Sequence, residues 1–252
     1  MRTEIGNGVW YNADCFDAMS EIADNSVDMV LCDLPYGTTQ NKWDSVIPFD
    51  QLWAAYEWVA KDSAAIVLTA AQPFTSALVM SNPAMFKYDW TWRKPKGTGH
   101  LNAKRQPMRD KEDVLVFYDK QCTYNPQMTD GTPYKDKAGK NHAGTSSMTD
   151  NYGAYTNFRN DNDGKRYPKQ VIDFCVVERG GIHPTQKPVE LFEYLIRTYT
   201  NPGDVVLDNT AGAGTTAIAA ERAGRRWICI ERDEEYSAKA IERINNHIQA
   251  SS

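Results

Sequence analysis

Short apolar runs alternate with longer amphipathic segments over most of the chain. In the first half, two runs of strand length lie at 27–33 (VDMVLCD) and 64–70 (AAIVLTA), and the segment between them, 49–62 (FDQLWAAYEWVAKD), has helical periodicity. Parallel strands are joined by helical crossovers of this kind. The pattern therefore predicts an α/β domain built on a mostly parallel sheet.

Two further strand-like runs, 88–94 (YDWTWRK) and 113–119 (DVLVFYD), have no helical segment between them. We expect them to form an antiparallel hairpin at one edge of the sheet. The loop expected between them, 93–111, is rich in cations and contains one acid, Asp110. It is either a solvated loop or a surface for nucleic-acid phosphates. The cations that would contact phosphates there are Arg93, Lys94, Lys96, Lys104, Arg105 and Arg109.

From residue 182 onwards the α/β rhythm returns. Residues 188–200 (PVELFEYLIRTYT) are expected to form a helix that begins with a proline. Two short strands, 204–209 (DVVLDN) and 226–232 (RWICIER), flank a helix that stops at Gly224, and a long helix closes the chain. Both halves together predict a single sheet with helices on both faces.

Residues 120–181 differ from the rest of the chain in composition. They are dense in Gly, Asn, Asp, Tyr and Lys, poor in aliphatic residues and without periodicity. This is typical of a long surface loop or a disordered linker, but the interleaved tyrosines and cations also suit an insertion that contacts nucleic acid. We therefore expect three parts, namely 1–119, the insertion 120–181, and 182–252.

Composition narrows the class of protein. The chain has 252 residues, enough for one large core, and its net charge of -5 argues against a surface that is basic throughout. Five cysteines without a C-x-x-C pair indicate a reduced, intracellular protein, and four scattered histidines predict no metal site. No apolar run reaches the roughly 18 residues that span a bilayer. These features predict a soluble, cytoplasmic protein that has no membrane partner.

A glycine turn follows the first strand of the C-terminal segment, in the sequence LDNTAGAGTT. The strand ends at Asp208, and Gly212 and Gly214 lead into a helix N-terminus, which offers amide donors and positive potential to a ligand. Nineteen residues after Gly212, Glu231 ends the next strand, where an acid can bind the hydroxyls of an adenosine ribose. Ala217 replaces the last glycine of the dinucleotide fingerprint, so S-adenosylmethionine becomes a candidate ligand. The alternative is a tight turn that binds nothing.

The segment 183–190 (HPTQKPVE) lies just before this strand. Two prolines fix the entry into a helix, and His183, Thr185 and Lys187 can donate hydrogen bonds to a carboxylate at its N-terminus. Alone, the segment would be interpreted as a proline-stiffened linker. Its position next to the glycine turn favours a ligand.

The buried strand 27–33 ends in the sequence D-L-P-Y, residues 33–36. Ligands of open parallel sheets bind beyond the carboxyl ends of the strands, so Asp33 and Tyr36 would share a crevice with the glycine turn. The exocyclic amine of a nucleobase is a poor nucleophile and needs acceptors for its hydrogens, which the Asp33 carboxylate and the Leu34 carbonyl can supply. Tyr36 can stack on a flipped base. A plain β-turn would explain Asp33 and Pro35 but not Tyr36.

These motifs resemble those of a known family. D-L-P-Y resembles the D-P-P-Y motif of amino-directed DNA methyltransferases, A-G-A-G-T-T resembles their cofactor loop, and H-P-T-Q-K-P resembles the segment that precedes this loop. Their order, with the catalytic motif first, is the permuted order of the β group of N6-adenine and N4-cytosine methyltransferases. The resemblance covers about 1–119 and 182–249. It implies a Rossmann-like, circularly permuted methyltransferase fold whose cofactor is S-adenosyl-L-methionine.

The resemblance also implies roles for individual residues. Asp33, Leu34 (through its carbonyl), Pro35 and Tyr36 would hold the target amine. The cofactor-binding residues would be Asp14, Cys15, His183, Thr185, Lys187, Asp208, Ala211, Gly212, Gly214, Thr215 and Glu231. Thr185 and Lys187 would lie near the methionine carboxylate, and Asp14 and Cys15 near the adenine. Residues 93–111 would belong to the DNA channel and 120–181 to the target-recognition region.

The sequence departs from the family pattern at two places. Leu34 replaces the first proline of the catalytic motif, and Asn209-Thr210 replaces the usual Pro-Phe before the glycines. The predicted activity is nevertheless direct transfer of a methyl group to N6 of a flipped adenine in a specific sequence of double-stranded DNA, where proximity and orientation supply most of the catalysis. By the resemblance, Asp at position 33 favours adenine over N4-cytosine.

Two alternative functions belong to other classes of protein: a nucleotide-binding oxidoreductase and an inactive DNA-binding module. A homodimer and a companion restriction endonuclease, as in a restriction-modification system, are further expectations from the resemblance.

Overall fold

The structure is a computed structural model that describes residues 1–39, 41, 44–135, 146–151, 153–156, 162–177, 182 and 186–251. The chain divides into two compact units. The first consists of Met1–Asn125 with Gln170–Ser252, and the second of Pro126–Lys169. Among the helices so described, none has the length and apolar character needed to cross a bilayer.

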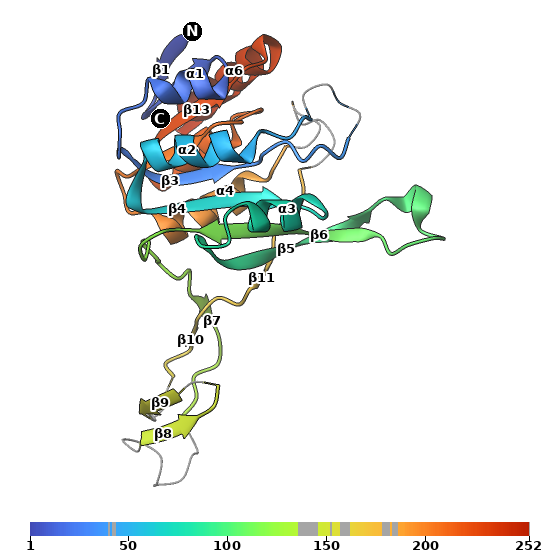
Figure 1. The fold of residues 1–252 in the computed structure, drawn as a ribbon, viewed down its shortest axis with the longest axis vertical. Coiled ribbons are helices and arrows are strands. Elements are labelled where there is room, and N and C mark those ends of the chain that lie inside the picture. The colour runs from blue at the N-terminus through green and yellow to red at the C-terminus, as the bar shows by residue number, and fades with distance from the viewer. Residues whose placement is uncertain are drawn as a thin grey trace. The chain divides into compact units, whose positions relative to one another are not determined.

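The first unit is built on one large sheet (Figure 1). In the described residues its strand order is β1-β2-β13-β12-β3-β4-β6-β5-β11. The bounds are β1 (Arg2–Ile5), β2 (Gly8–Asn12), β3 (Val27–Cys32), β4 (Ala60–Ala70), β5 (Phe86–Thr98), β6 (Arg109–Phe117), β11 (Val171–Asp173), β12 (Val205–Asp208) and β13 (Arg226–Glu231). Neighbours from β2 to β4 pair in parallel, and β6 pairs antiparallel with both β4 and β5. The predicted parallel sheet with an antiparallel hairpin edge is thus confirmed.

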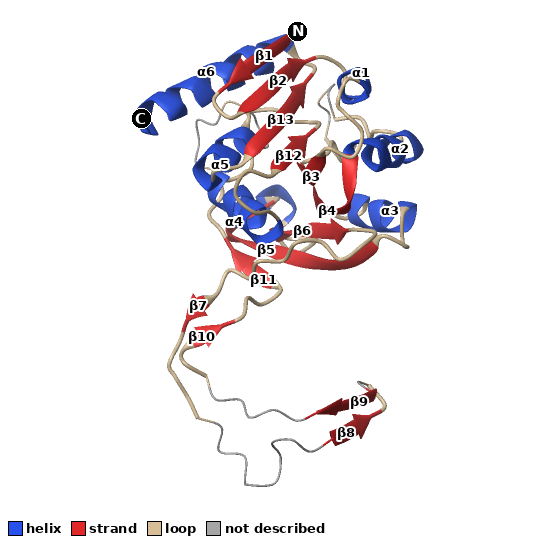
Figure 2. Cartoon of the chain, turned by 90° about the vertical axis from the view of Figure 1, so that its left-hand side faces the viewer, coloured by secondary structure: helices blue, strands red, loops and turns tan. Residues whose placement is uncertain are grey.

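Helices cover both faces of this sheet, as predicted (Figure 2). The helices α1 (Cys15–Ser20), α2 (Phe49–Val59) and α3 (Phe74–Ser81) lie on one face, and α4 (Val189–Tyr199), α5 (Thr215–Ala223) and α6 (Glu234–Ser251) on the other. Successive residues of β3 enter different cores: Leu31 packs in the cluster that includes α4 and α5, and Val30 in the cluster that includes α2. From Met29 to Cys32 the strand is buried on both faces and has no polar side, which explains the continuous apolar run there.

The antiparallel hairpin extends further than its hydrophobic pattern predicts. β5 continues to Thr98 and β6 begins at Arg109, so much of the segment 93–111, expected to be a loop, is β-structure. A short 3-10 turn, η1 (His100–Asn102), lies at the tip. The expectation of a loop was wrong because residues near the tip are exposed on both sides, and a strand without a buried face has no apolar alternation.

In the part of the second unit that the structure describes, the strands form two short antiparallel ladders. β7 (Thr129–Asp130) pairs with β10 (Lys165–Arg166), and β8 (Ser146–Thr149) pairs with β9 (Gly153–Thr156). Both ends of the segment 120–181 belong instead to the first unit: residues 120–125 lie within Met1–Asn125, and β11 pairs in parallel with β5. Strands of two to four residues are too short to leave a period in the sequence.

Candidate active site

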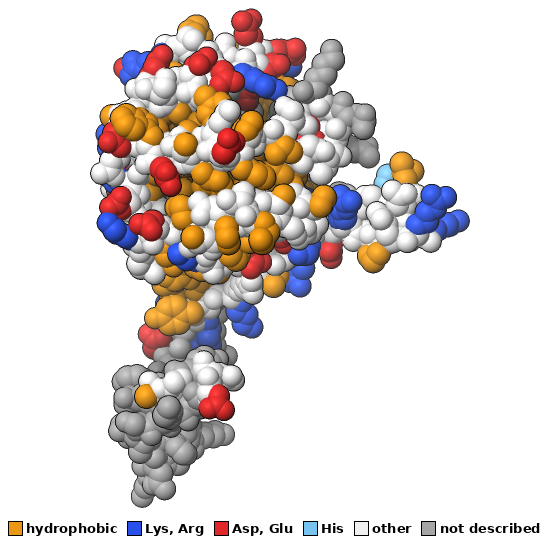
Figure 3. Space-filling view, in the orientation of Figure 1, with side chains coloured by type: hydrophobic (Ala, Val, Ile, Leu, Met, Phe, Trp, Pro, Cys, Tyr) orange, Lys and Arg blue, Asp and Glu red, His pale blue; other side chains and the backbone are white. Residues whose placement is uncertain are grey.

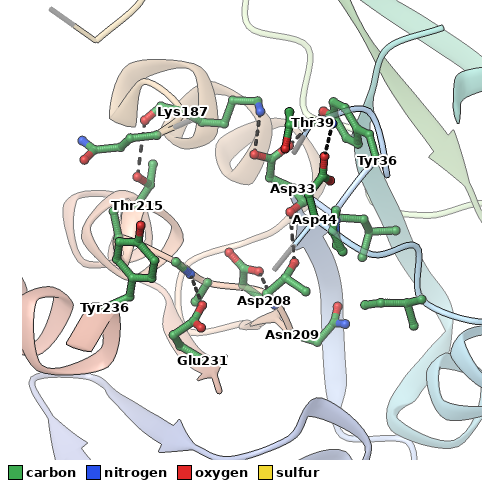
Figure 4. Close-up of a pocket in the computed structure, with 18 of the residues that line it drawn as sticks. Asp33, Tyr36, Thr39, Asp44, Lys187, Asp208, Asn209, Thr215, Glu231 and Tyr236 are labelled. Carbon is green, nitrogen blue, oxygen red and sulfur yellow. Dashed lines mark hydrogen bonds and ion pairs between the residues drawn. The ribbon is translucent and has the colours of Figure 1, made fainter. Parts of the chain in front are cut away.

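A pocket of about 630 Å³ lies at the carboxyl edge of the parallel strands. Its polar lining includes Asp14 after β2, Asp33 after β3, Asp208 at the end of β12 and Glu231 at the end of β13 (Figure 4). Parallel strands bring their carboxyl ends to one edge, so residues far apart in the sequence meet there. The pocket is large enough for a nucleoside-sized ligand.

The Asp33 carboxylate is held by three side chains. Its Oδ1 accepts hydrogen bonds from Tyr36 Oη at 2.8 Å and Thr69 Oγ1 at 2.5 Å. Its Oδ2 accepts one from Lys187 Nζ at 2.5 Å. Thr210 Oγ1 donates to the backbone carbonyl of Asp33 at 3.1 Å, which ties the catalytic stretch to the glycine turn. The orientation of this carboxylate is therefore fixed.

Tyr36 anchors the same stretch through its ring and its hydroxyl. The ring stacks on Phe74 of α3, with centroids 5.1 Å apart and planes inclined by 24°. Burial, and then the negative charges of Asp33 and Glu112, raise the pKa of Tyr36 well above its usual value. The hydroxyl consequently stays protonated and donates to Asp33.

Asp44 shapes the backbone that follows Tyr36. Its carboxylate accepts hydrogen bonds from the backbone N–H groups of Gly37 at 2.8 Å, Thr38 at 2.9 Å and Thr39 at 2.6 Å. Burial opposes its ionisation, but the hydrogen bonds outweigh burial and hold the pKa of Asp44 below its usual value. Gly37 has φ +67°, and a Cβ there would lie 2.8 Å from a methyl carbon of Val46. The turn therefore requires the glycine of D-L-P-Y-G.

The glycine turn and Glu231 form the other side of the pocket. The backbone N–H of Gly212 donates to Glu231 Oε2 at 2.9 Å, and that of Asp233 donates to Glu231 Oε1 at 2.8 Å. Each carboxylate oxygen retains room for a further donor. Burial raises the pKa of Glu231. Gly214, with φ +71°, is the N-cap of α5, where a Cβ would lie 3.0 Å from Ile244.

Asp208 is buried below this turn. Thr216 Oγ1 donates to its Oδ2 at 2.5 Å, and the backbone N–H of Thr210 donates to its Oδ1 at 3.0 Å. Burial, partly offset by these hydrogen bonds, raises the pKa of Asp208 to about 7. The group thus titrates near neutral pH.

Asn209, which departs from the family pattern, is also buried. Its Oδ1 accepts hydrogen bonds from Tyr56 Oη of α2 at 2.7 Å and from the Cys32 thiol at 2.9 Å. Burial raises the pKa of Cys32 well above its usual value, so the thiol remains a donor. A side-chain network therefore fixes the end of β12 at the position where the family has proline.

The structure brings most of the predicted site residues together. The catalytic candidates Asp33, Leu34, Pro35 and Tyr36 all line the pocket, with Asp14, Cys15, Lys187, Asp208, Ala211, Gly212, Thr215 and Glu231. Asp14 also accepts a hydrogen bond from the backbone N–H of Phe16 at 2.9 Å and so caps α1. Gly214 is not among the residues that line the pocket. His183 and Thr185 lie outside the described residues.

The predicted DNA-binding cations occupy different environments. Lys94 is mostly buried, pairs with Glu112 and lines the pocket, which Arg109 also lines from an exposed position. Arg93 pairs with Asp173 of β11 at 2.6 Å on the surface. The other three, Lys96, Lys104 and Arg105, are exposed along the hairpin. Basic side chains are visible at its far end in Figure 3.

Sequence reasoning missed Thr69 and Glu112. Thr69 lies in the apolar run of β4, and Glu112 shares a sheet face with Val114 and Val116. A polar residue on an otherwise buried face of a strand was the available signal, because such a residue needs a partner. The partner of Thr69 is Asp33, and the partners of Glu112 are Lys94 and Lys187.

The fold and pocket define an α/β protein of the class that binds nucleosides at the carboxyl edge of a parallel sheet. A family model described as DNA methylase matches residues 27–242, most of the chain. The protein belongs to this family of N6/N4 DNA methylases, as its motifs predicted.

Curated relatives are similar in sequence to nearly the whole chain. The type II methyltransferase M1.MboII of Moraxella bovis is 29% identical over 253 residues, which cover 91% of this chain and 94% of the relative. The type II methyltransferase M.HpaI of Haemophilus parainfluenzae is 26% identical over 249 residues, with 93% of this chain and 73% of the relative covered.

Solved structures share the fold. The complex of M1.HpyAVI with S-adenosylmethionine has a TM-score of 0.63 and 23% identity and covers 94% of this chain and 98% of its own. The cytosine-N4-specific PvuII DNA methyltransferase has a TM-score of 0.67 and 17% identity and covers 98% and 94%. These structures confirm the predicted fold. Membership of the DNA methylase family supports S-adenosyl-L-methionine as the cofactor.

Proposed function

We propose that the protein transfers the methyl group of S-adenosyl-L-methionine to N6 of a flipped adenine in double-stranded DNA. The observation that carries the proposal is that Asp33 and Tyr36 share one pocket with Gly212 and Glu231 (Figure 4). A group that accepts an amine hydrogen therefore lies in the same cavity as an acid and a glycine turn suited to a nucleoside cofactor.

The cofactor half of the proposal rests on the geometry around Glu231. Its two oxygens, each holding one backbone N–H, can also accept the two hydroxyls of the cofactor ribose. Asp14 and Cys15 line the pocket after β2, the strand next to β13, and are assigned to the adenine end of the cofactor. S-adenosyl-L-methionine would supply an electrophilic methyl group on a sulfonium.

The protein's own part in the reaction is to hold the amine. Asp33 and the Leu34 carbonyl accept its two hydrogens, which favours a pyramidal nitrogen whose lone pair is available. When bound, S-adenosyl-L-methionine would supply the methyl group to this lone pair and leave as its neutral thioether, and the amine would release one proton to Asp33 or to water. Orientation supplies most of the rate enhancement, since the transfer is a direct displacement.

DNA binding is assigned to the hairpin and to the segment 120–181. The exposed cations Lys96, Lys104 and Arg105 would bind phosphates, and 120–181 would read the target sequence. A role in a restriction-modification system is a separate part of the proposal, supported by the type II methyltransferases among the relatives.

The test is transfer of a tritiated methyl group to DNA amplified by a polymerase, which carries no methyl groups, followed by chromatography of the digested nucleosides. The label should appear in N6-methyladenine with the wild type and be lost with Asp33→Ala. Label in N4-methylcytosine would support the alternative target within the family. No label in either base, or full activity of Asp33→Ala, would refute the proposal.

A further inference from the structure

Four charged side chains of alternating sign follow one another across the sheet. Lys187 Nζ lies 2.5 Å from Asp33 Oδ2 and 3.4 Å from Glu112 Oε2, and Lys94 pairs with the other oxygen of Glu112. Asp33 follows β3, while Glu112 and Lys94 belong to β6 and β5. All four are mostly buried; the exposed fraction of the Lys187 side chain is 7%. We call these residues the charge cluster.

The charge cluster is electrically balanced, with two cations and two carboxylates. Burial by itself would lower the pKa of Lys187, but the charges of Asp33 and Glu112 outweigh burial and raise it. Lys187 therefore remains an ammonium. Glu112 Oε2 is buried without a hydrogen-bond partner and lies 3.4 Å from the Lys187 ammonium, which therefore shares with Lys94 the compensation of the Glu112 charge.

The contacts of Asp33 show what Lys187 does for it. Tyr36 and Thr69 both donate to Oδ1, and Lys187 donates to Oδ2. The carboxylate cannot rotate without breaking three hydrogen bonds, and Oδ2 keeps one acceptor position for an incoming N–H.

We propose that Lys187, itself held by Glu112, is a positioning residue that fixes Asp33 in the orientation that receives the target amine. This role rests on the proposed function. It differs from the role that the family resemblance gave Lys187, a contact to the methionine carboxylate, because the lysine is directed to the amine-holding carboxylate instead.

The two roles predict different kinetics for Lys187→Met. A positioning residue acts on the methyl-transfer step, so the single-turnover rate at saturating S-adenosylmethionine should fall about 100-fold, the loss typical of a misplaced reactive group. The Kd for S-adenosylmethionine should change by less than about 3-fold. A lysine that binds the methionine carboxylate would instead raise that Kd by about 10-fold or more and leave the rate at saturation unchanged.

Glu112→Gln provides a second, charge-based readout. Lys187→Met leaves the charge cluster with one excess negative charge beside Asp33, and adding Glu112→Gln restores neutrality without a large change of shape. The double variant should therefore recover part of the lost rate, which a merely destabilised protein would not do. Lys187→Gln repeats the test with a polar side chain if the methionine variant does not fold.

The experiment uses the full chain, tritiated S-adenosylmethionine and polymerase-amplified DNA. The number of target sites is counted as the number of methyl groups that the DNA accepts at the plateau of the reaction, and the enzyme is used in excess of these sites. Titration calorimetry gives the cofactor Kd in parallel. Lys239→Met, on the surface of α6 and paired with Glu235, is the matched control. An active wild type with an unchanged rate in Lys187→Met and Lys187→Gln would overturn this role alone. A wild type that methylates no exocyclic amine would overturn the proposed function and this role with it.

Discussion

The backbone N–H of Gly212 donates a hydrogen bond to the Glu231 carboxylate at 2.9 Å, across the ends of β12 and β13. The sequence, in which they stand nineteen residues apart, predicts the glycine turn and the acid as two parts of one cofactor site. Their direct bond means that the residue expected to bind the ribose also sets the conformation of the turn. A substitution of either residue should therefore change the affinity for the cofactor.

Glu231→Gln tests this coupling. The amide can still accept from Gly212 or Asp233, but it loses the charge that strengthens hydrogen bonds to the ribose hydroxyls. We expect the Kd for S-adenosylmethionine to rise about 10-fold or more, since a hydrogen bond to a charged group contributes roughly 1.5–3 kcal/mol. Titration calorimetry measures this Kd, with Glu4→Gln, at an exposed position of β1, as the control. An unchanged Kd would show that Glu231 does not bind the cofactor.

Tyr36→Phe should slow methyl transfer without weakening cofactor binding. The variant keeps the ring that stacks on Phe74 but removes the hydroxyl that donates to Asp33. Thr69 still holds the same oxygen, so the expected loss in kcat is moderate, about 10-fold, the lower end of what a hydrogen bond to a charged group contributes. A kcat equal to that of the wild type would show that Thr69 and Lys187 suffice to orient Asp33.

Asp208 should make the stability of the protein depend on pH. Burial raises the pKa of Asp208 from 3.8 to about 7, so the folded state binds this proton more tightly than the unfolded chain does. The contribution of Asp208 to the free energy of unfolding therefore decreases as the pH rises between about 4 and 7, by on the order of 4 kcal/mol.

The near-isosteric Asp208→Asn does not titrate, which makes it the comparison for this effect. Urea unfolding at pH 5 and at pH 8 should show the variant gaining stability relative to the wild type at the higher pH. A difference between the two proteins that stays constant across this range would contradict the buried, titrating carboxyl.

The exposed hairpin cations should control DNA affinity rather than chemistry. Lys104→Ala combined with Arg105→Ala removes two exposed charges near the hairpin tip. The slope of log K against log salt should decrease in magnitude by about 2, because each phosphate contact contributes roughly 0.9. Fluorescence anisotropy with duplex DNA measures this slope, and Lys239→Ala is the control. A slope equal to that of the wild type would place the DNA elsewhere.

The sequence alone determined the elements whose cause is local. The buried run of β3, the helix that ends at Gly224 and the turn at Gly212 each follow from periodicity or turn chemistry within a few neighbouring residues. The rule that parallel strands end at one edge was then enough to predict that Asp33 and Glu231 line one pocket. The same logic failed for residues 95–98 of the hairpin, because a strand exposed on both faces has no hydrophobic period.

Only the tertiary structure decided which side chains meet within that pocket. Lys187 and Asp33 are 154 residues apart, and their contact depends on where α4 begins above the sheet. Glu112 reaches Lys187 because β6 follows β4 in the strand order, which no local pattern encodes. Side-chain partners depend on strand order and register, whereas a sequence pattern records only which face of its own element each residue occupies.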